Sequence, residues 1–76
     1  MKEYLEFIAR QLVDQPDHVR VDTEERNEKL VCRLSVDPAD VGKVIGKQGR
    51  TAQALRTLLI AAAARAGKRA MLEIIQ

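Results

Sequence analysis

Two glycines, Gly46 and Gly49, interrupt a segment whose flanks are both patterned for helix. Glycine adopts backbone angles that other residues avoid, and it places no Cβ between the backbone and a neighbouring group. The chain is therefore expected to turn sharply between two helices at this point. The side chains in and beside the turn are hydrogen-bond donors at neutral pH, namely those of Lys43, Lys47, Gln48 and Arg50. A turn of this composition is suited to binding phosphate groups.

The charged residues are divided unevenly along the 76-residue chain. Residues 1–40 contain six Lys or Arg against ten Asp or Glu, whereas residues 41–76 contain seven Lys or Arg against Glu73 alone. The formal net charge of +2 conceals this separation. A basic half with one acid favours a polyanion as its partner, although ordinary solvated charge would give the same count.

Apolar residues recur at helical spacing in three segments and follow the pattern of strands in three others. The predicted helices are residues 2–13, 38–45 and 50–66, and the predicted strands are residues 18–23, 30–36 and 68–75. Residues 24–27 are predicted to be the turn of an antiparallel hairpin. Asp37 is expected to cap the second helix, and Gly67 is expected to end the third. The order α-β-β-α-α-β predicts an α+β domain.

Residues 44–56 read Val-Ile-Gly-Lys-Gln-Gly-Arg-Thr-Ala-Gln-Ala-Leu-Arg and resemble the signature of the KH domain, an RNA-binding module. The α-β-β segment before this signature and the single strand after it resemble the type II arrangement. This resemblance implies three helices packed on one face of a three-stranded sheet, and one KH domain over residues 1–76. The chain is also similar in size to the small bacterial single-KH-domain proteins of the KhpA type.

The resemblance implies a way of binding RNA as well. KH domains hold about four nucleotides of a single strand and clamp the sugar–phosphate backbone with the Gly-x-x-Gly turn. Carried over by position, the RNA-binding residues are Lys43, Val44, Ile45, Gly46, Lys47, Gln48, Gly49 and Arg50. The bases would lie in a groove between the second helix and the second strand, for which the candidate residues are Arg33, Ser35, Val41 and Arg56. Val41, Val44 and Ile45 are the candidates for its apolar floor.

The expected function is non-catalytic binding of single-stranded RNA, as an RNA chaperone or post-transcriptional regulator. The alternative is a protein-interaction module that keeps the KH fold and binds RNA weakly or not at all. No residue obviously recognises a 2′-hydroxyl group, so RNA and single-stranded DNA are not distinguished.

Enzymatic and metal-dependent functions have little support in the sequence. Gly42 and Gly46 enclose three residues rather than the four of a nucleotide-binding P-loop, and Gln48 stands where Ser or Thr would hold Mg²⁺. The only histidine, His18, is expected on a strand, and the only cysteine, Cys32, on the apolar face of its strand. No cofactor and no metal are expected.

The sequence also predicts a cytoplasmic location. Glu3 and Glu6 stand where a secretory signal would be apolar. The uncharged apolar run at residues 58–64 is shorter than the ~20 residues that span a bilayer. A single unpaired cysteine is typical of a reducing compartment.

The third predicted helix is apolar on more than one side. The stripe expected to face the core comprises Ala52, Leu55, Leu59, Ala62 and Ala66. A second set forms a candidate dimer face, comprising Thr57, Leu58, Ile60, Ala61, Ala64 and Arg65. Because an exposed apolar patch suggests a protein partner, a homodimer or a heterodimer with another KH protein is expected.

Overall fold

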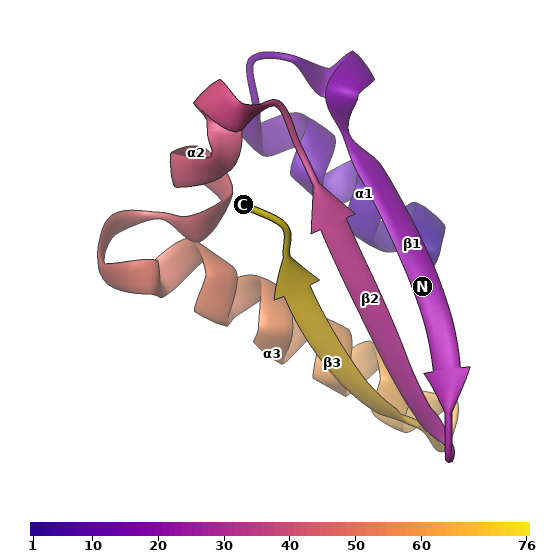
Figure 1. Ribbon diagram of the computed structural model, residues 1–76. Coiled ribbons are helices and arrows are strands. Elements are labelled where there is room, and N and C mark those ends of the chain that lie inside the picture. Colours follow the sequence, from indigo (N-terminus) through magenta and orange to yellow (C-terminus); the bar gives the residue numbers. More distant parts are fainter.

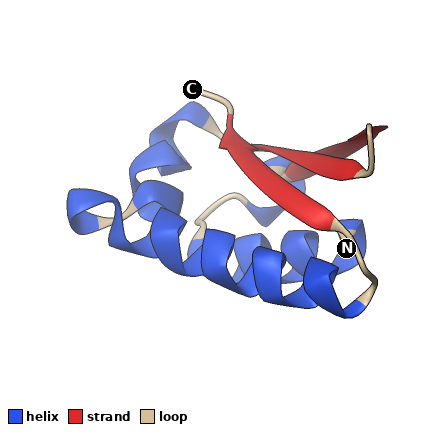
Figure 2. Cartoon of the chain, turned by 90° about the horizontal axis from the view of Figure 1, so that it is seen from below, coloured by secondary structure: helices blue, strands red, loops and turns tan.

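The computed structural model covers residues 1–76 and has two layers, a three-stranded sheet and a layer of helices on one of its faces (Figures 1 and 2). In chain order the elements are α1 (Lys2–Leu12), β1 (Arg20–Arg26), β2 (Lys29–Ser35), α2 (Val41–Ile45), α3 (Arg50–Arg65) and β3 (Arg69–Ile74). Short 3₁₀ turns at Pro16–His18, Pro38–Asp40 and Lys47–Gly49 precede β1, α2 and α3. The predicted α+β class and the predicted order of elements are confirmed.

The central strand is β2, which pairs antiparallel with β1 and parallel with β3. Leu34 shows the register, because it lies opposite Val21 of β1 and Ile74 of β3. A tight turn cannot join two parallel strands, so the chain needs a long crossover between β2 and β3. That crossover consists of α2 and α3, and it carries the Gly46–Gly49 turn at the end farthest from the sheet (Figure 1).

The hydrophobic core lies between the sheet and the helices. Leu30, Cys32 and Leu34 alternate along β2 and belong to one buried cluster with residues of α1 and α3. Leu5 of α1 and Leu59 of α3 are each only 2% exposed. Burying a leucine side chain contributes about 2 kcal/mol, so these contacts hold α3 in one rotational setting. The exposed side of α3, which includes the candidate dimer face, follows from that setting.

The buried stripe of α3 differs from the predicted one at its C-terminal end. Ala52, Leu55 and Leu59 are buried as expected, but the next buried residue is Ala63, while Ala62 is half-buried and Ala66 is exposed. A step of four residues after Leu59 keeps the stripe over the sheet, because the α-helix repeats every ~3.6 residues. The helix ends before Gly67, whose φ of +72° fits the predicted C-terminal glycine. None of the helices has the length and apolar character that crossing a membrane requires.

The hairpin between β1 and β2 is longer and tighter than predicted. Glu24, predicted as a turn residue, belongs to β1 and pairs with Val31. The turn consists of Asn27 and Glu28, whose φ angles are +49° and +67°. Two adjacent residues with positive φ form the two-residue turn whose twist matches that of the flanking strands. The charged composition of the segment concealed this arrangement in the sequence.

Candidate functional site

The Gly46–Gly49 turn has a backbone that requires glycine at its first position. Gly46 has φ +78° and ψ 174°, a region that is essentially limited to glycine. A Cβ on Gly46 would lie 2.7 Å from the Cβ and 2.8 Å from the backbone N of Thr51, which no real contact allows. Gly49 also has a positive φ, of +73°, but a Cβ there would meet no atom within 4 Å. The position of Thr51 against the turn is visible only in the folded structure and was not predicted.

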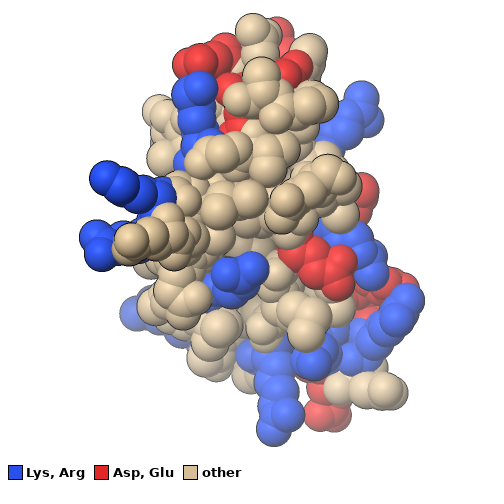
Figure 3. All heavy atoms as spheres, turned by 60° about the vertical axis from the view of Figure 1, so that its left-hand side comes forward, with Lys and Arg blue, Asp and Glu red and all other residues tan.

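The cations of the turn are exposed and free of acidic partners. Lys47, Gln48 and Arg50 are all exposed, and neither Lys47 nor Arg50 forms a salt bridge. The one recorded side-chain contact is a long hydrogen bond of 3.4 Å from Arg50 Nη2 to Gln48 Oε1. Figure 3 shows this side of the molecule, where Lys and Arg side chains project at the left edge and acidic groups gather at the upper end. The positive charge here is therefore available to a ligand.

Lys43 differs from the other predicted cations because it has acidic partners within the chain. Its Nζ lies 3.1 Å from Asp14 Oδ2 and 3.6 Å from Asp40 Oδ1. The hydrogen bond that Lys43 donates to the Asp14 carboxylate is the main reason that the pKa of Lys43 lies above its ordinary value. Lys43 thus links α2 to the segment that follows α1.

Two aspartates fix α2 in place. The side chain of Asp37 accepts a hydrogen bond of 2.9 Å from the Ala39 N–H, as predicted for a cap, and its second oxygen lies 2.7 Å from His18 Nδ1. Asp40 is the only buried charged residue, at 1% exposure, and its Oδ2 accepts a 3.0 Å hydrogen bond from the Gln15 N–H. These contacts tie residues 14–18 to α2, so His18 lies in a 3₁₀ turn rather than on the predicted strand.

The apolar residues of α2 divide between the core and the surface. Val44 is fully buried and belongs to the hydrophobic core. The prediction that the Val44 side chain contacts RNA and forms the floor of a groove is therefore wrong, because that side chain is buried in the hydrophobic core. Val41 and Ile45 are half-buried and remain partly accessible.

A hollow of about 460 Å³ lies between α2 and the ends of β2 and β3. It brings Ser35 and Val41, both predicted as groove residues, together with Ile75 at the end of the chain. Ile75 was not among the predicted groove residues, because only the parallel pairing of β3 with β2 brings the C-terminus beside α2 (Figure 1). Ile75 is 45% exposed, which is unusual for a large apolar side chain. Because exposure is a property of the folded chain, no pattern in the sequence indicated this residue.

Arg33 does not line that hollow. It lies on the open face of the sheet, where Nη2 is 3.2 Å from Glu24 Oε2 and Nε is 3.2 Å from Glu73 Oε2. The hydrogen bond to Glu24 is the main reason that the pKa of Arg33 is raised. The prediction of Arg33 as a groove residue is therefore corrected, because alternation along β2 directs it away from the helices and two carboxylates hold it there.

The remaining predicted residues lie along α3. Arg56 is half-buried and faces β3. The candidate dimer residues are all exposed, and Leu58 and Ile60 are 45% and 52% exposed. Two of them, Ile60 and Ala64, lie on the side of α3 that faces β3.

The geometry of the turn is suited to binding an anion. No group of three or more His, Cys, Asp or Glu side chains is arranged to hold a metal ion. Cys32 is fully buried, and this burial raises the pKa of its thiol, so it packs as a small apolar side chain. What the site offers is a glycine turn, two free cations and an adjacent apolar hollow.

Comparison with known proteins gives matches over almost the whole chain. A family model described as "KhpA/KhpB, KH domain" matches residues 2–74. The RNA-binding protein KhpA of Aquifex aeolicus is 51% identical over 76 residues, which cover 100% of this chain and 96% of that protein. The RNA-binding protein KhpA of Clostridium acetobutylicum is 51% identical over 75 residues, which cover 99% of this chain and 100% of that protein. The RNA-binding protein KhpA of Bacillus subtilis is 47% identical over 74 residues, which cover 97% of this chain and 91% of that protein.

The two glycines of the turn are expected to respond differently to a methyl group. Gly46→Ala combines a glycine-only conformation with a clash against Thr51, so we expect a loss of ~3 kcal/mol in the free energy of unfolding. Gly49→Ala has open space and should lose only ~1 kcal/mol. Urea unfolding followed by circular dichroism measures both losses, and equal losses would contradict the role assigned to Thr51.

The cap of the turn before α2 is expected to depend on pH. The Ala39 N–H, and secondarily His18, lower the pKa of the Asp37 carboxyl. A lowered pKa in the folded state stabilises the fold above the unfolded pKa of ~3.9, and this stabilisation is lost as the pH falls through the folded pKa. The thermal midpoint of Asp37→Asn should therefore lie below that of the natural chain at neutral pH, and the gap should close in acid. Asp17→Asn, at an exposed acid without a recorded partner, is the control and should show no such gap.

Proposed function

Because the chain belongs to the KhpA/KhpB family of KH domains, we propose that it binds single-stranded RNA at the Gly46–Gly49 turn without catalysing a reaction. The observation that carries this proposal is the exposed turn with two cations, Lys47 and Arg50, that no acid neutralises. The names of the relatives, which are called RNA-binding proteins, support it as well.

The proposed clamp acts on the sugar–phosphate backbone. The N–H groups of Gly46 and Gly49 donate within the turn, to Gly42 and Gly46 carbonyls at 2.8 and 3.1 Å. The N–H groups of Lys47 and Gln48 are therefore the ones that we assign to phosphate oxygens. The N-terminus of α3 adds partial positive charge at the same place. Lys47 and Arg50 add full charges, and the bare backbone at Gly46 permits close approach.

The bases are proposed to turn from the clamp toward the hollow beside α2. Val41 and Ile75 supply apolar surface there, and the Ser35 hydroxyl can donate to or accept from a base edge. Ile45, which is half-buried at the end of α2, is proposed to add apolar surface. No aromatic side chain lies in this hollow, so stacking on a ring does not contribute. We therefore expect modest sequence preference. Lys43 contributes to the local field, since Asp14 and Asp40 already occupy its ammonium group.

The cellular role remains as the sequence predicts it, an RNA chaperone or a post-transcriptional regulator in the cytoplasm. Both roles require reversible binding to many single-stranded segments. A clamp that holds phosphates and reads few bases would provide such binding, because phosphate contacts carry no sequence information.

Removing the charge of the turn should abolish RNA binding while the fold persists. Lys47→Asp with Gln48→Asp places two carboxylates where phosphates are proposed to lie, so we expect at least a ~100-fold loss of affinity for a single-stranded oligonucleotide. Fluorescence anisotropy measures the affinity. For the natural chain, the logarithm of the binding constant should fall with the logarithm of salt concentration by about 0.7 per phosphate contacted.

The matched control is Lys2→Asp with Gln11→Asp. It makes the same two exchanges at exposed positions of α1, so it changes the net charge equally and should bind RNA nearly as well as the natural chain. Unchanged RNA binding in the turn variant, with circular dichroism showing both variants folded, would contradict the clamp.

A second candidate function is assembly with another copy of the chain or with another KH protein. It is favoured by apolar residues on the outer side of α3, of which Leu58 is 45% exposed. Small residues beside it, such as Ala61, would let a second helix approach closely. Two linked sites would also raise the apparent affinity for one RNA strand, provided that both sites can reach it. In this alternative the domain acts mainly as a partner or scaffold.

Self-association should be measurable and should depend on Leu58. Sedimentation is expected to give twice the chain mass of 8.5 kDa at tens of micromolar, and Leu58→Asp should return it to the monomer mass because a carboxylate resists burial. Phe7→Asp, at a residue of α1 that is 63% exposed, is the matched control. A natural chain that sediments as a monomer, or an equal effect of Phe7→Asp, would rule out this face.

A further inference from the structure

One hydroxyl group borders the glycine turn, that of Thr51. Thr51 is the second residue of α3, and the Cα–Cβ bonds of a helix tilt toward its N-terminus. The side chain therefore leans back over the turn, where its Oγ1 and Cβ occupy the place that a Cβ on Gly46 would need. The hydroxyl thus lies against the backbone of the turn.

The Thr51 hydroxyl has no hydrogen-bond partner within the chain. Thr57, the other hydroxyl residue of α3, donates to the Gln53 carbonyl at 3.0 Å, whereas the Thr51 side chain takes part in no hydrogen bond. Thr51 is half-buried, yet no buried side-chain oxygen or nitrogen of the chain lacks a partner. Solvent therefore reaches its Oγ1, and a ligand can reach it too.

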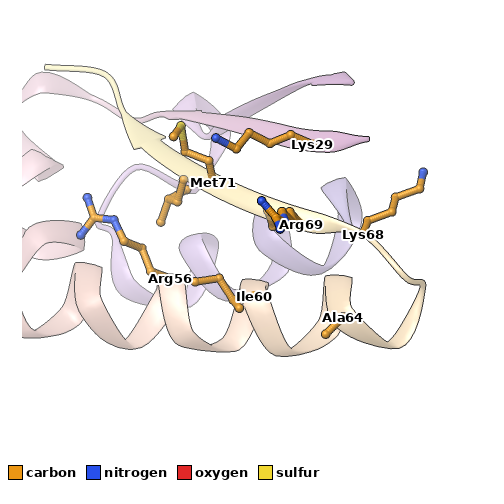
Figure 4. A pocket seen from close by; sticks show the side chains of 9 residues that line it. Lys29, Arg56, Ile60, Ala64, Lys68, Arg69 and Met71 are labelled. Atoms are coloured by element: carbon orange, nitrogen blue, oxygen red, sulfur yellow. The ribbon is translucent and has the colours of Figure 1, made fainter. Parts of the chain in front are cut away.

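The rest of α3 offers charged and apolar groups but no second free hydroxyl. Figure 4 shows the hollow between α3 and β3, which nine residues line, five of them apolar and the other four Lys or Arg. With the Thr57 hydroxyl bonded to its own helix, Thr51 supplies the only free hydroxyl group along α3.

The surroundings of this hydroxyl favour a phosphate oxygen as its acceptor. Its neighbours in the turn, Lys47 and Arg50, form no salt bridge, so they leave a positive field around it. A hydroxyl can donate to an anionic oxygen, and such a bond is stronger than one between neutral groups. We infer that Thr51 Oγ1 donates a hydrogen bond to a phosphate oxygen of the RNA strand at the turn. The inference rests on the proposed function, to which it adds a neutral contact beside the charged ones.

A neutral donor and a cation affect the salt dependence of binding differently. Each phosphate that a cation neutralises releases counterions and adds about 0.7 to the salt slope for a single strand. The Thr51 hydroxyl carries no charge and releases none. Its removal should therefore lower the affinity by the same factor at every salt concentration, whereas removal of the Lys47 charge should also reduce the slope.

The test replaces the hydroxyl with a methyl group of similar shape, as in Thr51→Val. Fluorescence anisotropy with an end-labelled oligoadenylate measures the affinity across a series of salt concentrations. We expect Thr51→Val to lose roughly five- to tenfold in affinity with an unchanged slope, and Thr51→Ser, which keeps the hydroxyl, to stay within about threefold of the natural chain. Lys47→Gln is the charged comparison and should reduce the slope by about 0.7.

The matched control is Thr23→Val, which makes the same exchange at an exposed residue of β1. It should change the affinity by less than about twofold. Thr51→Ala and Thr51→Ser form a second pair that differs only by the hydroxyl group, so the test does not depend on how valine packs beside Gly46. The alanine variant should bind roughly five- to tenfold more weakly than the serine variant.

Three results would overturn the inference. Thr51→Val that binds as tightly as the natural chain would show that the hydroxyl makes no contact. Thr51→Ser that binds as weakly as Thr51→Val would assign the effect to the methyl group and its packing against Gly46. A reduced slope for Thr51→Val would show that charged contacts were lost with it, through a change in the turn.

Failure of the inference and failure of the proposed function give different results. If Lys47→Asp with Gln48→Asp abolishes binding and Thr51→Val changes nothing, the clamp stands without a contact from Thr51. If the natural chain binds no RNA, the proposed function is wrong, and the inference falls with it.

Discussion

The parallel pairing of β2 with β3 determines where everything else in the molecule lies. Two parallel neighbours need a crossover, and here the crossover is made of α2, the glycine turn and α3. The turn is consequently held away from the sheet, where a ligand can reach it. The same pairing returns the C-terminus to α2, so Ile75 meets Val41 across a hollow. The two surfaces to which we assign RNA binding, namely the turn and the hollow beside α2, both border this crossover.

Acidic residues and basic residues have different uses in this fold. Most recorded salt bridges use acids of the first half of the chain to hold structure, as Glu24 does for Arg33, Asp14 for Lys43 and Glu25 for Lys68. Lys47, Arg50 and Arg56 are left without such partners. The uneven charge of the sequence is therefore sharper on the surface than the residue counts suggest, because pairing neutralises cations such as Arg33, Lys43 and Lys68 and leaves the two cations of the turn free.

Local signals in the sequence were sufficient for the fold class, the order of the elements, the cap at Asp37 and the end of α3 at Gly67. These features depend on residues close together in the chain. The burial of Val44, the pairing of Arg33 with Glu73 and the arrival of Ile75 beside α2 depend on contacts between distant segments, which periodicity does not describe. The hairpin turn at Asn27 and Glu28 was not predicted, because a run of charged residues usually indicates a loop. Here the charged residues 24–26 continue β1, whose outer face is open to solvent.

Asp40 shows that the helix before the glycine turn is held in place by a segment distant in the sequence. A helix of five residues, as α2 is, does not form by itself, because nucleation costs more than so few hydrogen bonds return. The helix is instead stabilised by the segment after α1, where the Gln15 N–H donates a hydrogen bond to the buried carboxylate of Asp40. A change in α1 or in its connection to β1 is therefore expected to loosen the turn to which we assign RNA binding, and to lower the affinity for a ligand that the altered residue never touches.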